Sequence, residues 1–184
     1  MGTKKPTWRD VNSVLQDWEK DRLIGLIQDL HKLSGTNADF LHARLLDADA
    51  AQSLVPYKKR IKQAISPAQP WKQDVQLREG RKAISDYKKA SGDVRGVLTL
   101  MVYYIQCGND FTLEFGDIDE TFYNSLCSML DQVKKQLIAR NDQKLAHDFI
   151  PVLEQEFQRI DGQMGWGYPD EFCEQVAELR ERFG

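Results

Sequence analysis

The sequence predicts an all-α protein of eight or nine helices, arranged as an antiparallel bundle or as a short curved stack of helix pairs. Apolar residues recur at spacings of three and four through most of the chain, which is the period of an amphipathic helix. No segment alternates apolar and polar residues between hairpin turns, as a sheet would require. Residues 94–107 are apolar nearly all round, which is typical of a helix buried at the centre of a fold.

The size and composition favour one all-helical domain over residues 1–184, within which residues 7–47 could form an N-terminal subdomain. Of the 184 residues, 41% are hydrophobic and 29% are charged, which is ordinary for a globular domain and argues against a disordered chain. The net charge of -3 favours neither a nucleic-acid specialist nor an acidic solvating tail.

Capping residues and breaks in the apolar period predict where the helices begin and end. The expected helices cover residues 8–18, 19–33, 38–46, 56–65, 74–90, 94–107 with a possible extension to 115, 119–139, 142–160 and 169–183. Thr7 is expected to cap the first helix, Gly35 to end the second and Asn37 to start the third. Pro56 is expected to open the fourth helix, because the first turn needs no proline amide. Residues 66–73 hold two prolines and no apolar period, so a loop is expected there.

Polar residues, proline and glycine predict the helix boundaries in the second half of the chain. Asp74, Asp93 and Asp119 are each expected to cap the helix that follows. Pro151 predicts a kink or a break, because it removes one hydrogen bond and clashes with the carbonyl four residues back. The glycine-rich turn at residues 162–167 lacks the pattern of a phosphate loop and is expected to fold back onto the helix ends.

Several short strings between residues 40 and 125 occur together. They are FLHARL at 40–45, YKK at 57–59, AISDYKK at 83–89, LMVYY at 100–104, FGDIDE at 115–120 and FYNS at 122–125. With these strings the chain resembles a family of bacterial helical proteins that is catalogued only as a domain of unknown function. The likeness covers most of residues 8–140. It implies a bacterial, cytoplasmic, helical protein, and it implies no activity.

A basic segment lies at residues 57–89, where ten Lys or Arg residues stand against three acids. The candidate binding residues in it are Lys58, Lys59, Arg60, Lys62, Trp71, Arg78, Arg81, Lys82, Lys88 and Lys89. Two adjacent helices with basic outer faces could bind phosphate groups, and the ring of Trp71 could provide a stacking surface. The other interpretation is a solvated pair of helix faces whose charges pair with acids elsewhere, which the acidic balance of the whole chain favours.

An acidic segment follows at residues 96–133, which contain six acids and no Lys or Arg. The candidate acidic patch within it is Asp117, Asp119 and Glu120. Its spacing fails as a calcium loop, because Phe122 stands where such a loop needs glycine. Caps and first-turn acids of a helix explain these residues better. The basic and acidic segments could face each other, within one chain or between two copies.

Neither the histidines nor the cysteines suggest a catalytic or metal site. They are His31, His42 and His147, and Cys107, Cys127 and Cys173. The histidines are far apart along the chain and lack metal-ligand spacing, and no serine elbow or Cys–His pair is evident. The odd, widely spaced cysteines fit neither a disulfide framework nor a zinc site. No metal and no cofactor is therefore expected.

These observations favour a non-enzymatic helical protein-interaction module whose partner is another protein or a second copy of the chain. Two alternatives stay open: sequence-independent nucleic-acid or phosphate binding through residues 57–89, and a helical-bundle enzyme that uses the acids near Asp117. No apolar run approaches the roughly 20 residues that cross a bilayer, and the N-terminus has no apolar signal core. A cytoplasmic protein without a membrane partner is expected.

Overall fold

The computed structural model describes residues 5–46 and 50–184, apart from the side chain of Ala50. These described residues form nine α-helices and no β-strand, which confirms the predicted all-α class. The helices are α1 (Trp8–Leu15), α2 (Lys20–Leu33), α3 (Gly35–Leu45), α4 (Ala50–Ile65), α5 (Leu77–Ser91), α6 (Val94–Phe115), α7 (Glu120–Arg140), α8 (Gln143–Ile160) and α9 (Tyr168–Phe183). None of them is both long enough and apolar enough to cross a membrane.

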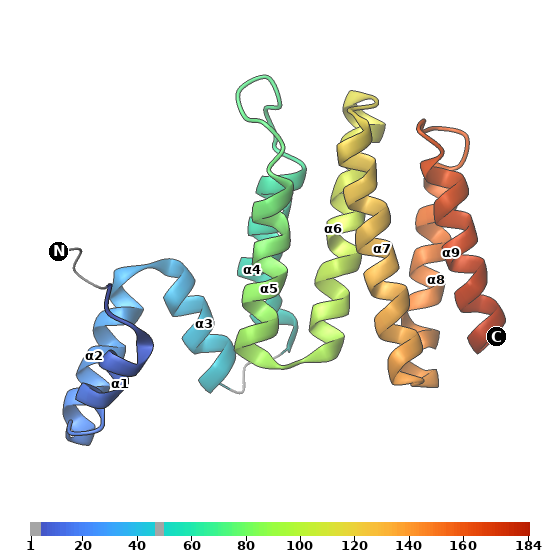
Figure 1. Ribbon diagram of the computed structural model, residues 1–184. Helices are drawn as coiled ribbons and strands as arrows, with labels where there is room; N and C mark the ends of the chain where they lie inside the picture. Colours follow the sequence, from blue (N-terminus) through green and yellow to red (C-terminus); the bar gives the residue numbers. More distant parts are fainter. Residues whose placement is uncertain (1–4, 47–49) are drawn as a thin grey trace.

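Six of the helices form three antiparallel pairs that stand in a row: α4 with α5, α6 with α7, and α8 with α9 (Figure 1). Along the row, α4 packs against α6 and α6 against α8, while α7 packs against α9 on the other layer. Each pair therefore contacts its neighbours in sequence. Of the two predicted arrangements, the structure is the stack of helix pairs.

Helix α6 lies at the centre of this row and contacts helices of both flanking pairs. Its side chains Leu98, Leu100, Tyr104 and Ile105 are fully buried, which confirms the prediction of a buried central helix. The helix continues past residue 107 because its next turn is also buried. Gly108 makes the close packing with α7 possible, since a Cβ atom there would come within 2.5 Å of a Leu126 methyl group.

The first three helices are packed differently. α2 packs against α3, and α3 packs against α5 and α4, so that α3 joins the N-terminal helices to the stack (Figure 1). No residue of α1, α2 or α3 is buried. These helices cover most of the predicted subdomain at 7–47, although residue 47 lies outside the described residues. The separate nature of that subdomain stays a prediction.

Three of the predicted caps occupy the expected positions. Thr7, Asp93 and Asp119 each precede the first residue of a helix, as predicted. The Oδ1 atom of Asp119 accepts a hydrogen bond of 2.8 Å from the Phe122 amide. The Asp10 carboxylate in turn accepts a bond of 2.7 Å from the Thr7 amide. Local side-chain hydrogen bonds therefore help to set the starts of α1 and α7, whereas Asp93 precedes α6 without a capping bond from its side chain.

The prediction for the turn after the second helix was wrong. Gly35 is the first residue of α3 rather than the end of α2, and Ser34 rather than Asn37 is the cap. The Ser34 hydroxyl oxygen accepts a hydrogen bond of 3.2 Å from the Asn37 amide, three residues further on. A serine with an extended backbone can end one helix and start the next without a glycine turn.

The predictions for Pro56 and Asp74 as helix starts were also wrong. Helix α4 begins at Ala50, upstream of Pro56, because Leu54 is buried and holds the earlier turn in helical form. Helix α5 begins only at Leu77, with Gln76 in the capping position. The Gln76 amide donates a bond of 2.7 Å to the carbonyl of Ala64, which holds the preceding residues along the end of α4.

Pro151 does not break the helix that contains it, because α8 is continuous from Gln143 to Ile160. Phe149, Ile150 and Leu153 are all buried on the two sides of the proline. Their packing against the stack holds the helix together across the missing hydrogen bond.

Replacing a central side chain of α6 should test this arrangement. Leu100→Ala should lower the free energy of unfolding by about 2–5 kcal/mol, because it removes buried methyl groups and leaves a cavity. Val55→Ala, at a side chain on α4 that is 60% exposed, should change it by less than about 0.5 kcal/mol. Urea denaturation followed by circular dichroism measures both values, and equal losses would contradict the central position of α6.

Candidate functional site

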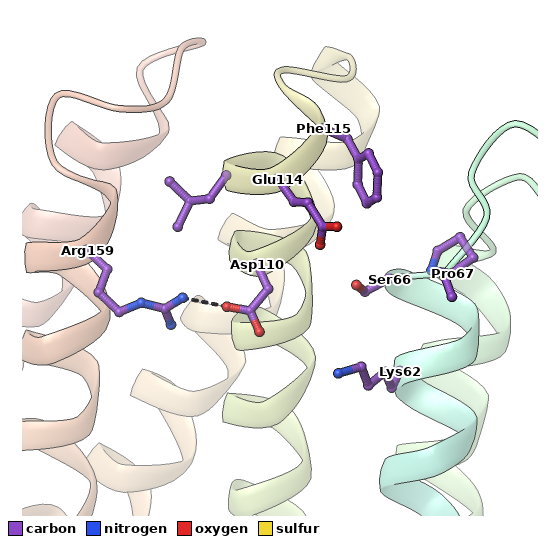
Figure 2. Close-up of a pocket in the computed structure, with 9 residues that line it drawn as sticks. Lys62, Ser66, Pro67, Asp110, Glu114, Phe115 and Arg159 are labelled. Atoms are coloured by element: carbon purple, nitrogen blue, oxygen red, sulfur yellow. Dashed lines mark hydrogen bonds and ion pairs between the residues drawn. The ribbon is translucent and has the colours of Figure 1, made fainter.

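A polar cleft of about 590 Å³ opens between the C-terminal halves of α4, α6 and α8 (Figure 2). Arg159 of α8 forms an ion pair with Asp110 of α6, with 2.5 Å between Nη2 and Oδ1. Lys62 of α4 extends from the opposite wall, and Glu114 lies above Asp110 (Figure 2). Hydrogen bonding to Asp110 raises the pKa of Arg159. The cleft thus combines both charge signs, and its central carboxylate is already paired.

A buried polar network lies behind this cleft and joins α6, α8 and α9. Glu156, which is only 4% exposed, accepts hydrogen bonds from Arg159 at 2.8 and 3.0 Å. It also accepts a bond of 3.1 Å from the side-chain amide of Asn109. The Asn109 carbonyl oxygen accepts a bond of 2.8 Å from the Tyr168 hydroxyl. Each of these groups therefore has a partner within the network, as buried polar groups in folded proteins usually do.

The predicted acidic patch lies at the turn between α6 and α7. Asp117 accepts hydrogen bonds from the Tyr123 hydroxyl and, at 3.2 Å, from the Gly165 amide. Burial and this bond to Asp117 raise the pKa of Tyr123. Asp119 caps α7, and Glu120 is an exposed first-turn residue. Asp117 therefore holds the glycine-rich turn at 162–167 back against the α6–α7 turn, as the sequence predicted for that turn.

The basic segment is dispersed over the stack. Arg60 forms an ion pair of 2.8 Å with Asp86, and Lys58 lies 5.2 Å above the Tyr103 ring of α6. Arg81 donates a bond of 2.7 Å to the carbonyl of Ser125 on α7. These cations therefore belong to contacts within the fold.

The remaining candidates of the basic segment are exposed. Lys82 has only a loose ion pair of 4.0 Å with Glu79. The side chains without an ion pair to any described residue are Lys59, Lys62, Arg78, Lys88 and Lys89. Trp71 is 72% exposed in the loop after α4. Among the described residues, no ion pair joins the basic segment to an acid of residues 96–133, so the two segments do not neutralise each other directly.

The structure brings together two histidines that the sequence analysis treated as separate. The Nε2 atoms of His31 on α2 and His42 on α3 are 3.1 Å apart, and both side chains are exposed. Their separation of eleven residues carries no recognisable spacing. The turn at Ser34, which folds α3 back against α2, creates the pair.

The cysteines divide into two buried thiols and one exposed thiol. Burial raises the pKa of Cys107 to about 11 and that of Cys127 to about 12. Both thiols are therefore protonated at neutral pH and poor nucleophiles. Cys173 is exposed on α9.

The largest departure from an ordinary globular surface is on the N-terminal helices. Of fifteen large hydrophobic side chains that are exposed among the described residues, ten lie on or directly after α1, α2 and α3. These ten, named the N-terminal apolar surface, are Trp8, Val11, Val14, Ile24, Ile27, Leu30, Leu33, Phe40, Leu45 and Leu46. The amphipathic period of residues 8–33 showed which side chains are apolar. It could not show that these side chains are exposed within the part of the chain that the structure describes.

The polar network should matter for stability. Asn109→Leu should lower the free energy of unfolding by about 1–3 kcal/mol, because it leaves the buried Tyr168 hydroxyl without its acceptor and removes one hydrogen bond to Glu156. Asn124→Leu, at an exposed site on α7, provides the matched control. Chemical denaturation compares them, and a similarly small change in both would show that the network adds little.

Thiol reactivity should follow burial. In the folded protein one thiol per chain, that of Cys173, should react quickly with a disulfide reagent at mildly alkaline pH. The thiols of Cys107 and Cys127 should react only after denaturation. A spectrophotometric thiol count with and without denaturant checks this, and three fast thiols in the native protein would contradict the packing of α6 and α7.

Comparison of the chain with protein-family models, with curated proteins and with solved structures gives no match. The resemblance of residues 8–140 to a bacterial family of unknown function stays a prediction. Any functional conclusion therefore depends on the surfaces of the molecule itself.

Proposed function

We propose that this chain is a non-enzymatic protein-interaction module, and that a second copy of the chain covers its N-terminal apolar surface. One observation carries the proposal: ten large apolar side chains on or directly after α1–α3 are exposed, and α1–α3 bury none. The cytoplasmic location and the bacterial origin that the sequence predicts are part of the same proposal.

The energetic reason is the hydrophobic effect. Moving an exposed Leu, Ile or Val side chain out of water stabilises an assembly by roughly 1.5–3 kcal/mol when burial is complete. Monomers rarely expose a contiguous apolar patch larger than a few hundred Å², and larger ones usually mark a binding surface. Leu33 is 75% exposed and Trp8 is 71% exposed.

A second copy suits this surface because of its charge. Residues 5–46 contain six Lys or Arg residues and six Asp or Glu residues, so the region carries no net charge. Two copies can therefore approach through the same face without like-charge repulsion, as a two-fold interface requires. A strongly charged partner would gain little from such a face.

The two alternatives have weaker support. Nucleic-acid binding through residues 57–89 could use only part of the basic segment, because Arg60 and Arg81 are bound within the fold. An enzyme using the acids near Asp117 would need that carboxylate beside a substrate pocket. Asp117 instead accepts two hydrogen bonds at a turn.

The oligomeric state tests the proposal. Light scattering after size exclusion should give the wild-type chain twice its mass of 21.2 kDa. The double variant Ile27→Ser/Leu33→Ser should be a monomer, because it removes two apolar contacts from the interface. The matched control is Ile138→Ser, at an exposed apolar side chain on α7, and it should remain a dimer. Circular dichroism should show the same helix content in all three proteins.

Two results would overturn the proposal. A wild-type chain that stays monomeric at every accessible concentration would exclude a second copy as the occupant. Dissociation by Ile138→Ser and not by the double variant would place the interface on the stack instead of on α1–α3.

A further inference from the structure

His31 and His42 bring two imidazole nitrogens within hydrogen-bond distance of each other. His31 lies in the last turn of α2 and His42 in the last turn of α3. Their Nε2 atoms are 3.1 Å apart, and their ring centroids are 5.1 Å apart with the planes inclined by 51°. Both rings are exposed, so water and small ions can reach these nitrogens.

This separation matches two adjacent ligand positions of one metal ion. Imidazole nitrogens bind zinc at about 2.0–2.1 Å, so two of them lie roughly 2.8–3.4 Å apart at angles between square-planar and tetrahedral. The observed 3.1 Å falls inside this range. Neutral imidazole is a preferred ligand of Cu²⁺, Ni²⁺ and Zn²⁺, whereas Mg²⁺ and Ca²⁺ prefer oxygen.

We propose that His31 and His42 form a two-ligand site for a divalent transition-metal ion of the copper, nickel and zinc group. No cluster of three or more His, Cys, Asp or Glu side chains suited to a metal occurs within residues 5–46 and 50–184, so water completes the coordination shell. The site is independent of self-association, because both ligands come from one chain.

The same pair makes a hydrogen bond when no ion is present. One ring then donates Nε2–H to the bare Nε2 of the other ring. Binding an ion requires both Nε2 lone pairs, so the donor ring must carry its proton on Nδ1 instead. This change of tautomer needs no movement of either helix.

A bound ion would link α2 directly to α3. These two helices carry much of the N-terminal apolar surface and bury no residue. A coordinate link between them would fix the angle at which the surface is presented.

Titration with Cu²⁺ alone tests the site. Calorimetry should show one tight Cu²⁺ per wild-type chain, and electron paramagnetic resonance should show two coordinated nitrogens. His31→Ala and His42→Ala should each weaken binding roughly tenfold or more, because one of two imidazole ligands is lost. His147→Ala, at a lone exposed histidine on α8, should bind as the wild type does. Because all three histidines are exposed, the substitutions should leave the fold intact. Circular dichroism of each variant checks this.

Equal affinity in the wild type and in His31→Ala or His42→Ala would overturn the proposal and leave the pair as a hydrogen bond. A loss of affinity in His147→Ala as large as in the other two would also overturn it. The double variant Ile27→Ser/Leu33→Ser should keep the wild-type affinity, which separates this site from the fate of the proposed dimer. A loss of binding in that variant would contradict a site made by one chain.

Discussion

Burial of α6 on most of its sides is the constraint that organises the stack. A helix with apolar residues around most of its circumference must be covered by several neighbours, and each amphipathic helix can cover only one side. The pairs α4/α5 and α8/α9 lie on either side of α6, and α7 covers it within its own pair (Figure 1). The order of the row follows from this requirement and from short connections that keep consecutive helices antiparallel.

Several polar groups within this core have close partners. The Tyr104 hydroxyl lies 2.7 Å from the Ser125 hydroxyl oxygen, and the Arg81 guanidinium lies 5.7 Å from the Tyr104 ring centre. At the other end of α6, Asn109 and Glu156 join three helices. Unpaired polar groups at such positions would destabilise the fold. These contacts therefore fix the position of each helix along its neighbour.

The two ends of the row have different surfaces. Apart from its buried side, α9 exposes mainly charged residues, including Glu174, Glu181 and Arg182, as expected for the last unit of a helical stack. At the other end, the ten members of the N-terminal apolar surface are exposed on or directly after α1–α3. Because of this asymmetry, α1–α3 are a better candidate for an interaction surface than the cleft or the basic segment.

The sequence by itself determined the helical class, most helix positions and the buried identity of residues 94–107, because periodicity and composition are local properties. It also predicted the caps Thr7, Asp93 and Asp119. Thr7 and Asp119 take part in hydrogen bonds within the first turn of their own helix, whereas Asp93 only precedes its helix. It failed at Pro56 and Asp74, where a buried Leu54 and a bond from Gln76 to Ala64 outweighed the local signals.

Only the tertiary structure decided between a bundle and a stack. It alone brought His31 next to His42 and showed that the side chains of the N-terminal apolar surface are exposed. Each of these depends on which surfaces meet across long stretches of chain. An apolar stripe has the same sequence pattern whether it faces a core or a partner, and a histidine pair eleven residues apart exists only once the turn at Ser34 has formed.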